Sequence, residues 1–159
     1  MKKLLVVLLL LAPTAVSSET GMSTPDAQLD AYVALLRTDL KAQRAAVIVS
    51  NMHFSDAETE AFWPVYNKYQ KEQSKVGDEK VALIKDYVAH LDQLDDKKAK
   101  ELTAKALAVE EQRLQIIKKY IGEFGKVLPA KQVARFFQLE LQMQRMIDLQ
   151  IAAELPLVQ

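Results

Sequence analysis

Residues that could do chemistry are few and scattered along the chain. The only histidines are His53 and His90, and there is no cysteine. A zinc-type site needs three or four nitrogen, sulfur or carboxylate ligands brought close together. A long predicted helix separates the two histidines by about 50 Å at 1.5 Å per residue. The sequence therefore predicts no metal ligands and no cofactor.

Three methionines are candidate ligands for a soft metal. Met143 and Met146 lie one helical turn apart, and Met52 is elsewhere. Thioethers bind copper, but methionine more often fills a core or lines an adaptable binding surface. We favour the packing role for all three.

Motifs of the common enzyme classes are missing from the sequence. It has no Gly-rich phosphate loop, no Gly-x-Ser-x-Gly elbow and no His-Glu-x-x-His motif. We therefore expect a protein that is not an enzyme and has no catalytic residues. An enzyme would need a deep polar pocket that the sequence does not reveal.

Basic side chains form two local groups. Arg37, Lys41 and Arg44 follow each other at spacings of four and three, which places them on one face of a helix. Such runs usually form a solvated face. The sharper hypothesis is a basic wall that binds unfolded client proteins. A second group comprises Arg113, Lys118 and Lys119.

The overall charge argues against a nucleic-acid partner. The chain has 159 residues, with 21 basic and 21 acidic side chains, whereas nucleic-acid binders usually carry a basic excess. Half of the residues are hydrophobic, which excludes a disordered chain. One domain is expected for this length.

The elements that position these residues are predicted to be helices. The chain has only four Gly and five Pro, and no hairpin turn signal or sustained strand alternation. Helix-start signals and helical apolar spacing predict an all-α fold of four long helices in antiparallel hairpins. The predicted helices span about 24–51, 55–94, 95–125 and 129–155. They form one domain over 25–155, followed by a tail at 156–159.

The N-terminus has the pattern of a secretory signal peptide. Lys2 and Lys3 precede an apolar run from Leu4 to Ala12, and small residues follow Pro13. The apolar run is shorter than the ~20 residues that a membrane span needs. We predict cleavage after Ser17, so that 1–17 is the signal, 18–24 a flexible leader, and no integral membrane segment remains. The alternative is an uncleaved anchor.

The beginning of the second predicted helix resembles that of the fourth. An apolar residue is followed by a capping position and, three residues later, by Glu or Gln. The first copy is Phe54, Ser55 and Glu58, and the second is Leu128, Pro129 and Gln132. An aromatic pair follows each copy at the same distance, Phe62-Trp63 and Phe136-Phe137. The first pair belongs to an aromatic cluster for which core packing is the default expectation.

This repeated pattern resembles the LTxxQ motif of the Spy/CpxP-like periplasmic family. Leu-Thr-x-x-Gln is itself a capping box preceded by an apolar residue. Here the copies read Phe-Ser-Asp-Ala-Glu and Leu-Pro-Ala-Lys-Gln. Pro129 has no hydroxyl and no N–H, so the reciprocal box is predicted to be lost in the second copy.

The resemblance implies a four-helix chain that forms an elongated, curved homodimer. It implies a periplasmic, ATP-independent chaperone that holds unfolded or misfolded envelope proteins on a helical surface. The alternative is a periplasmic sensory or regulatory module that binds a metal ion or an envelope-stress sensor kinase. A chaperone would suppress the aggregation of a client protein without added metal. A metal-binding sensory module would instead shift its melting temperature when micromolar metal is added.

Overall fold

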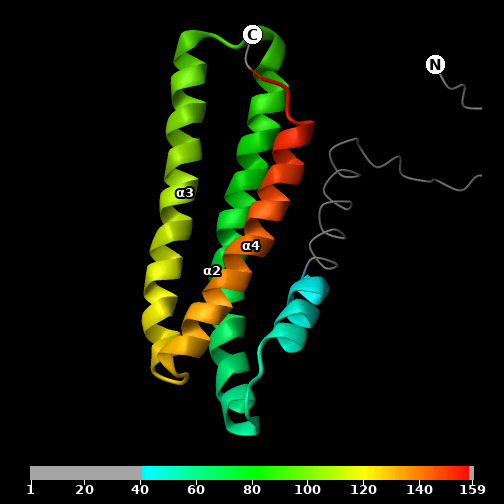
Figure 1. Cartoon of the computed structure of the whole chain (residues 1–159). Helices are drawn as coiled ribbons and strands as arrows, with labels where there is room; N and C mark the ends of the chain where they lie inside the picture. Colours follow the sequence, from blue (N-terminus) through cyan, green and yellow to red (C-terminus); the bar gives the residue numbers. More distant parts are fainter. Residues whose placement is uncertain (1–40, 158–159) are drawn as a thin grey trace, which may run out of the picture. The chain divides into compact units, whose positions relative to one another are not determined.

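The structure, a computed structural model, describes residues 41–157. These residues belong to one compact unit. The predicted signal peptide, leader and first part of the first helix lie outside them, as does Arg37. The described part contains helices and no strand, so the fold is all-α as predicted (Figure 1). Its elements are a helical segment over 41–51, α2 (Asp56–His90), the 3-10 turn η1 (Leu91–Gln93), α3 (Asp96–Gly125) and α4 (Ala130–Glu154).

The three helices α2, α3 and α4 each begin where a capping signal predicts. Ser55 is the N-cap of α2. Asp95 is the N-cap of α3, and its carboxylate accepts from the Lys98 backbone N–H at 2.7 Å. Pro129 occupies the N-cap position of α4. These starts follow from local hydrogen bonding and backbone restriction, which explains why the sequence locates them well.

The end of the second predicted helix differs from the prediction. Apolar spacing carried the prediction to Leu94, but α2 ends at His90 and η1 follows. Tighter 3-10 turns are frequent at helix ends. The side chains of a 3-10 turn are spaced much like those of an α-helix. The apolar periodicity alone therefore does not reveal where the α-helix gives way to the 3-10 turn.

The described helices are arranged as successive hairpins. α2 and α3 run side by side in opposite directions, and α4 turns back from the end of α3 (Figure 1). Asp148 joins α4 to both other helices: one carboxylate oxygen lies 2.6 Å from the Lys80 ammonium of α2, and the other lies 3.0 Å from the Arg113 guanidinium of α3. Near the C-terminus, the Tyr87 hydroxyl donates to the Pro156 carbonyl at 2.7 Å.

Aromatic rings form the centre of the core. The ring centroid of Phe62 is 5.3 Å from those of Phe124 and Phe136, so that α2, α3 and α4 meet at this ring. Tyr69 and Tyr120 continue the cluster with centroids 5.3 Å apart. The remaining buried members are Ile48, Met52, Tyr66, Leu128, Val133 and Phe137. Rings at these distances, stacked as for Phe62 and Phe124 or edge-to-face as for the other two pairs, add stability beyond the burial of their area.

The buried face of α3 was predicted only in part. Leu102, Val109 and Phe124 are buried as expected. Leu114 and Ile121, which the spacing assigned to the same face, remain 48% and 47% exposed. At 3.6 residues per turn, Leu114 and Ile121 lie roughly 100–140° around the helix from Leu102 and Val109, so they lie beside the face that packs on α2 and α4.

Among the described residues, no helix is both long enough and apolar enough to span a membrane.

Candidate functional site

The first motif copy forms the predicted capping box. The Ser55 hydroxyl accepts from the Glu58 backbone N–H at 3.3 Å, and the Glu58 carboxylate accepts from the Ser55 N–H at 2.8 Å. Phe54, which precedes the box, packs against the core with its ring 4.8 Å from that of Phe62. The box thus sets the start of α2 and brings an aromatic side chain onto the cluster.

The second copy lacks this reciprocal box, as predicted. No side chain caps α4 at Pro129, and Leu128 before it is buried. The Gln132 side-chain amide instead donates to the His53 backbone carbonyl at 3.2 Å. The two copies are therefore in contact, because the glutamine of the second bonds to the residue preceding Phe54 of the first.

The aromatic pairs that follow the two copies also meet. Phe62 and Phe136 occupy equivalent places in the repeat and contact each other edge-to-face. The second members of the two pairs differ. The ring centroid of Phe137 lies 5.8 Å from that of Phe124, whereas Trp63 is only partly buried at the margin of the cluster. The repeat therefore builds the core of the described body, and these rings do not form an open binding patch.

Two of the three residues of the predicted basic wall, Lys41 and Arg44, lie in the described part of the chain. Lys41 is exposed, but Arg44 is half-buried and faces inward. Its guanidinium forms an ion pair with Glu140 of α4 and donates to the Gln144 side-chain oxygen at 2.8 Å. Helical spacing cannot reveal this change of role, because the partner carboxylate lies 96 residues further along the chain. Arg44 is a structural cation here, and its role in client binding stays a prediction.

Glu140 is the buried charged residue of the described part, and sequence reasoning missed it. It is 3% exposed. The Tyr69 hydroxyl donates at 3.3 Å to the carboxylate oxygen that also pairs with Arg44. Burial, together with the Glu140 charge, raises the pKa of Tyr66 and of Tyr69. Both phenols therefore stay protonated at neutral pH, so the hydroxyl of Tyr69 remains a donor.

The second basic group is also largely engaged within the fold. Arg113 pairs with Asp148, as described above. Lys119 lies 2.6 Å from the Glu72 carboxylate and 5.1 Å from the centre of the Tyr120 ring. These contacts join Arg113 and Lys119 to neighbouring helices, while the side chains of Lys118 and Lys119 remain exposed.

The two histidines lie at opposite ends of α2, and Met52 and Met143 pack in and against the aromatic core. His53 lies before α2, and His90 is its last residue, with a ring nitrogen 3.1 Å from the Asp86 carboxylate. Met52 is buried in the core, and Met146 is 67% exposed. Across residues 41–157, no group of three or more His, Cys, Asp or Glu side chains is placed to hold a metal ion.

An exposed apolar line on α3 is the surface feature that sequence reasoning missed. Leu107, Leu114 and Ile121 are 67%, 48% and 47% exposed and follow each other at intervals of seven residues. At this spacing they lie on one side of the helix over about 21 Å. Exposed charges of both signs, Glu110 and Lys118, alternate with them. We call these three apolar side chains the α3 line; their seven-residue interval was the signal that could have found them.

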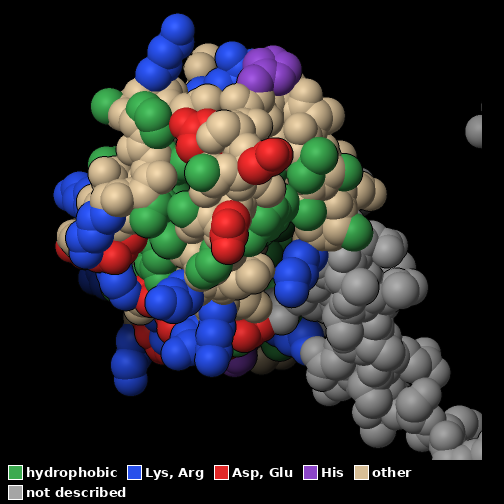
Figure 2. Space-filling model, turned by 90° about the horizontal axis from the view of Figure 1, so that it is seen from below, with side chains coloured by type: hydrophobic (Ala, Val, Ile, Leu, Met, Phe, Trp, Pro, Cys, Tyr) green, Lys and Arg blue, Asp and Glu red, His purple; other side chains and the backbone are tan. Residues whose placement is uncertain are grey.

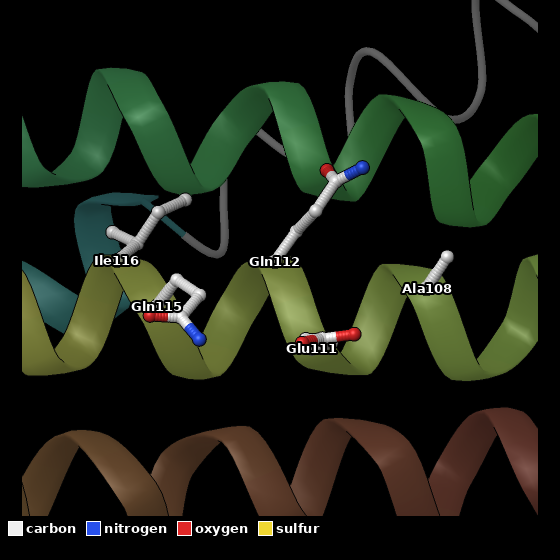
Figure 3. Close-up of a pocket in the computed structure, with 5 residues that line it drawn as sticks. All are labelled: Ala108, Glu111, Gln112, Gln115 and Ile116. Atoms are coloured by element: carbon white, nitrogen blue, oxygen red, sulfur yellow. The ribbon is translucent and has the colours of Figure 1, made fainter.

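A second surface feature is a hollow on α3. Gln112 and Ile116 extend toward α2 at this hollow, and Ala108, Glu111 and Gln115 complete its lining (Figure 3). It is open to solvent and has a single carboxylate. No nucleophile and base converge there, so it offers no arrangement for catalysis.

The end of the body where α2 begins has a mixed surface. In Figure 2, hydrophobic side chains gather at the centre of this end, acidic side chains lie among them, and Lys and Arg side chains lie around much of the margin, most densely at the left and below. Phe54 and Trp63, near this end of α2, are only partly buried. Apolar and charged groups are thus close together on this surface as well.

Comparison with protein-family models, with curated proteins and with solved structures gave no match.

Proposed function

We propose that this chain is an exported, ATP-independent chaperone-like protein that holds unfolded or misfolded envelope proteins on its helical surface. The periplasm is the compartment that its N-terminal pattern suggests. The resemblance of its two capping motifs to those of the Spy/CpxP-like family supports this function, as does their position at the helix starts. We also propose the homodimer that the resemblance implies.

The α3 line is the observation that carries the proposal. Burying an exposed aliphatic side chain contributes about 1–2 kcal/mol, so three of them give weak, reversible contacts. Glu110 and Lys118 beside the line can accept client segments of either charge. Weak apolar contact with mixed charge suits a protein that must bind many sequences and release them.

The test replaces the α3 line by polar residues of good helix propensity. We expect the variant Leu107→Gln/Leu114→Gln/Ile121→Gln to require at least about fivefold more protein to suppress aggregation of a chemically denatured client. Light scattering measures the suppression, and circular dichroism verifies equal helicity. Val88→Gln is the matched control, because Val88 is 53% exposed but lies on α2. Unchanged suppression by the triple variant at equal helicity would refute the proposed surface.

The same preparation tests the dimer and the regulatory alternative. Sedimentation should show an elongated dimer, and a compact monomer would contradict the homodimer. A chaperone should act equally well with and without a chelator. A melting temperature that rises with micromolar zinc, nickel or copper would instead favour the sensory module.

A further inference from the structure

The helical segment 41–51 contacts the body along a single stripe. Arg44, Ile48 and Met52 follow each other at intervals of four, which is one helical face. Ile48 is fully buried and Met52 is 4% exposed, both within the aromatic core. Val49 on the other side is 65% exposed. The segment and the residue that follows it thus dock as an amphipathic helix does in a recognition groove, with one basic and two apolar anchors.

Four side chains of α4 receive this segment. Arg44 bonds to Glu140 and Gln144, the Asn51 carbonyl accepts from Arg135 Nε at 2.7 Å, and the His53 carbonyl accepts from Gln132. The contacts move toward the start of α4 as the segment proceeds, so the two run antiparallel. We call Gln132, Arg135, Glu140 and Gln144 the α4 row.

The polar part of this junction is weakly optimised. The second oxygen of Glu140 and the nearby Tyr66 hydroxyl are buried without a hydrogen-bond partner. Removing an ion pair from water carries a desolvation cost that its attraction offsets only when the remaining polar atoms are also satisfied. This desolvation cost offsets part of the attraction between Arg44 and Glu140, so the polar contacts of the segment hold it less firmly than their number suggests.

We propose that the α4 row and the aromatic side chains beside it form a second binding surface, which the chain's own segment 41–51 occupies. Its external ligand is an amphipathic helical stretch with a basic residue followed by apolar residues four and eight positions later. The basic group would replace Arg44 at Glu140, and the apolar groups would replace Ile48 and Met52. This inference rests on the proposed function for its biological ligand, but the surface and its test do not require a client.

A peptide spanning residues 41–54 of the chain is the probe. Fluorescence anisotropy measures its binding to the full chain. The tethered segment competes at an effective concentration in the millimolar range, so binding to the parent chain is weak. The substitution Arg44→Ala in the full chain weakens the docking of its own segment. We therefore expect the Arg44→Ala chain to bind the peptide at least about tenfold more tightly than the parent chain does. Lys41→Ala is the matched control in the same segment and leaves peptide binding unchanged.

A second peptide with Glu at the Arg44 position tests the charge complementarity. We expect it to bind the Arg44→Ala chain at least about tenfold more weakly than the natural peptide. Equal affinity of the two peptides, or equal binding by the parent and Arg44→Ala chains, overturns the proposal.

Hydrogen exchange in the parent chain keeps the proposal testable if Arg44→Ala does not fold. We expect the amides of residues 45–51 to exchange at least about 100-fold faster than those of residues 62–69, because the segment opens without unfolding the core. Equal rates in the two regions overturn the proposal. Loss of client holding with retained peptide binding would refute the proposed function and leave this surface standing.

Discussion

The contact between Phe62 and Phe136 allows a quantitative test of the repeat as the source of the core. We predict that these two residues, which occupy equivalent places in the two motif copies, are energetically coupled. Their ring centroids are 5.3 Å apart at an interplanar angle of 77°, and both side chains are fully buried. Such pairs contribute about 0.5–1.5 kcal/mol beyond the area that they bury.

The perturbation is a double-mutant cycle with Phe62→Leu and Phe136→Leu. Each single change removes one ring from the shared contact and leaves an apolar side chain in place. We expect a coupling free energy of about 1 kcal/mol. Each single variant already loses the shared ring contact, so the double variant should lose less stability than the sum of the two single losses. Each single change should destabilise the protein by more than this coupling, since Phe62 also lies 5.3 Å from Phe124 and Phe136 lies 4.6 Å from it.

Urea unfolding followed by circular dichroism at 222 nm provides the free energies of unfolding. Tryptophan fluorescence is unsuitable because Trp63 contacts Phe62 directly. The control cycle pairs Phe62→Leu with Val76→Ala, a buried residue about 21 Å along α2. That cycle should be additive within about 0.5 kcal/mol. A Phe62–Phe136 coupling no larger than the control would refute the role that we assign to the repeated aromatic pair.

Three further predictions concern local contacts. Ser55→Ala should destabilise the protein by about 1 kcal/mol in urea unfolding through loss of the cap, whereas Ser55→Gly should cost only a few tenths; equal losses would contradict the capping role. Burial alone would raise the pKa of Asp148, but hydrogen bonds from Lys80 and Gln144 hold it below its usual range. Its stabilising contribution is therefore present above pH 4 and is lost as the pH falls through the lowered pKa. Asp148→Asn should be less stable than the parent by about 0.5–1 kcal/mol at pH 7, with a smaller difference at pH 3; a constant difference would argue against this linkage. Burial and the hydrogen bond to Glu72 raise the pKa of Tyr120 to about 12, so its contribution is complete below pH 10 and is lost as the pH rises through 12. In absorbance titration at 295 nm, Tyr120→Phe should remove amplitude above pH 11, and amplitude missing near pH 10 instead would count against the shift.

The structure also changes how the basic wall can be tested. Changing Arg37, Lys41 and Arg44 together to Glu would place the new carboxylate at position 44 against the buried carboxylate of Glu140. Loss of a buried ion-pair partner typically costs about 3–5 kcal/mol, so reduced client holding could reflect a damaged fold. Lys41→Glu alone avoids this, because Lys41 is exposed.

The helix starts could be predicted from the sequence because their causes are local. Ser55 and Glu58 form a reciprocal pair within one turn, and Asp95 caps α3 through a bond to Lys98. The loss of the box at Pro129 was equally predictable, since proline has neither the hydroxyl nor the N–H that the box needs. Each conclusion depends on atoms a few residues apart.

The exposure of the α3 line, unlike the helix starts, could not be predicted from local sequence signals. A helix with apolar residues on more than one side can present either side to its neighbours, and periodicity alone does not choose between them. Leu114 was assigned to the core and is exposed, whereas Tyr120 was not assigned and is 3% exposed. Tyr120 is held inside by its contacts with Tyr69 of α2 and Phe124 of α3.

The sequence by itself determined the all-α class, the starts of α2, α3 and α4, and the repeated motif, because capping and helix propensity act over one or two turns. Only the tertiary structure decided that the two motif copies touch, that Arg44 is paired with Glu140, and that the α3 line faces solvent. The physical reason is that burial depends on which faces of distant helices meet. A side chain such as Glu140 becomes a buried partner only when a cation from a remote segment is brought against it.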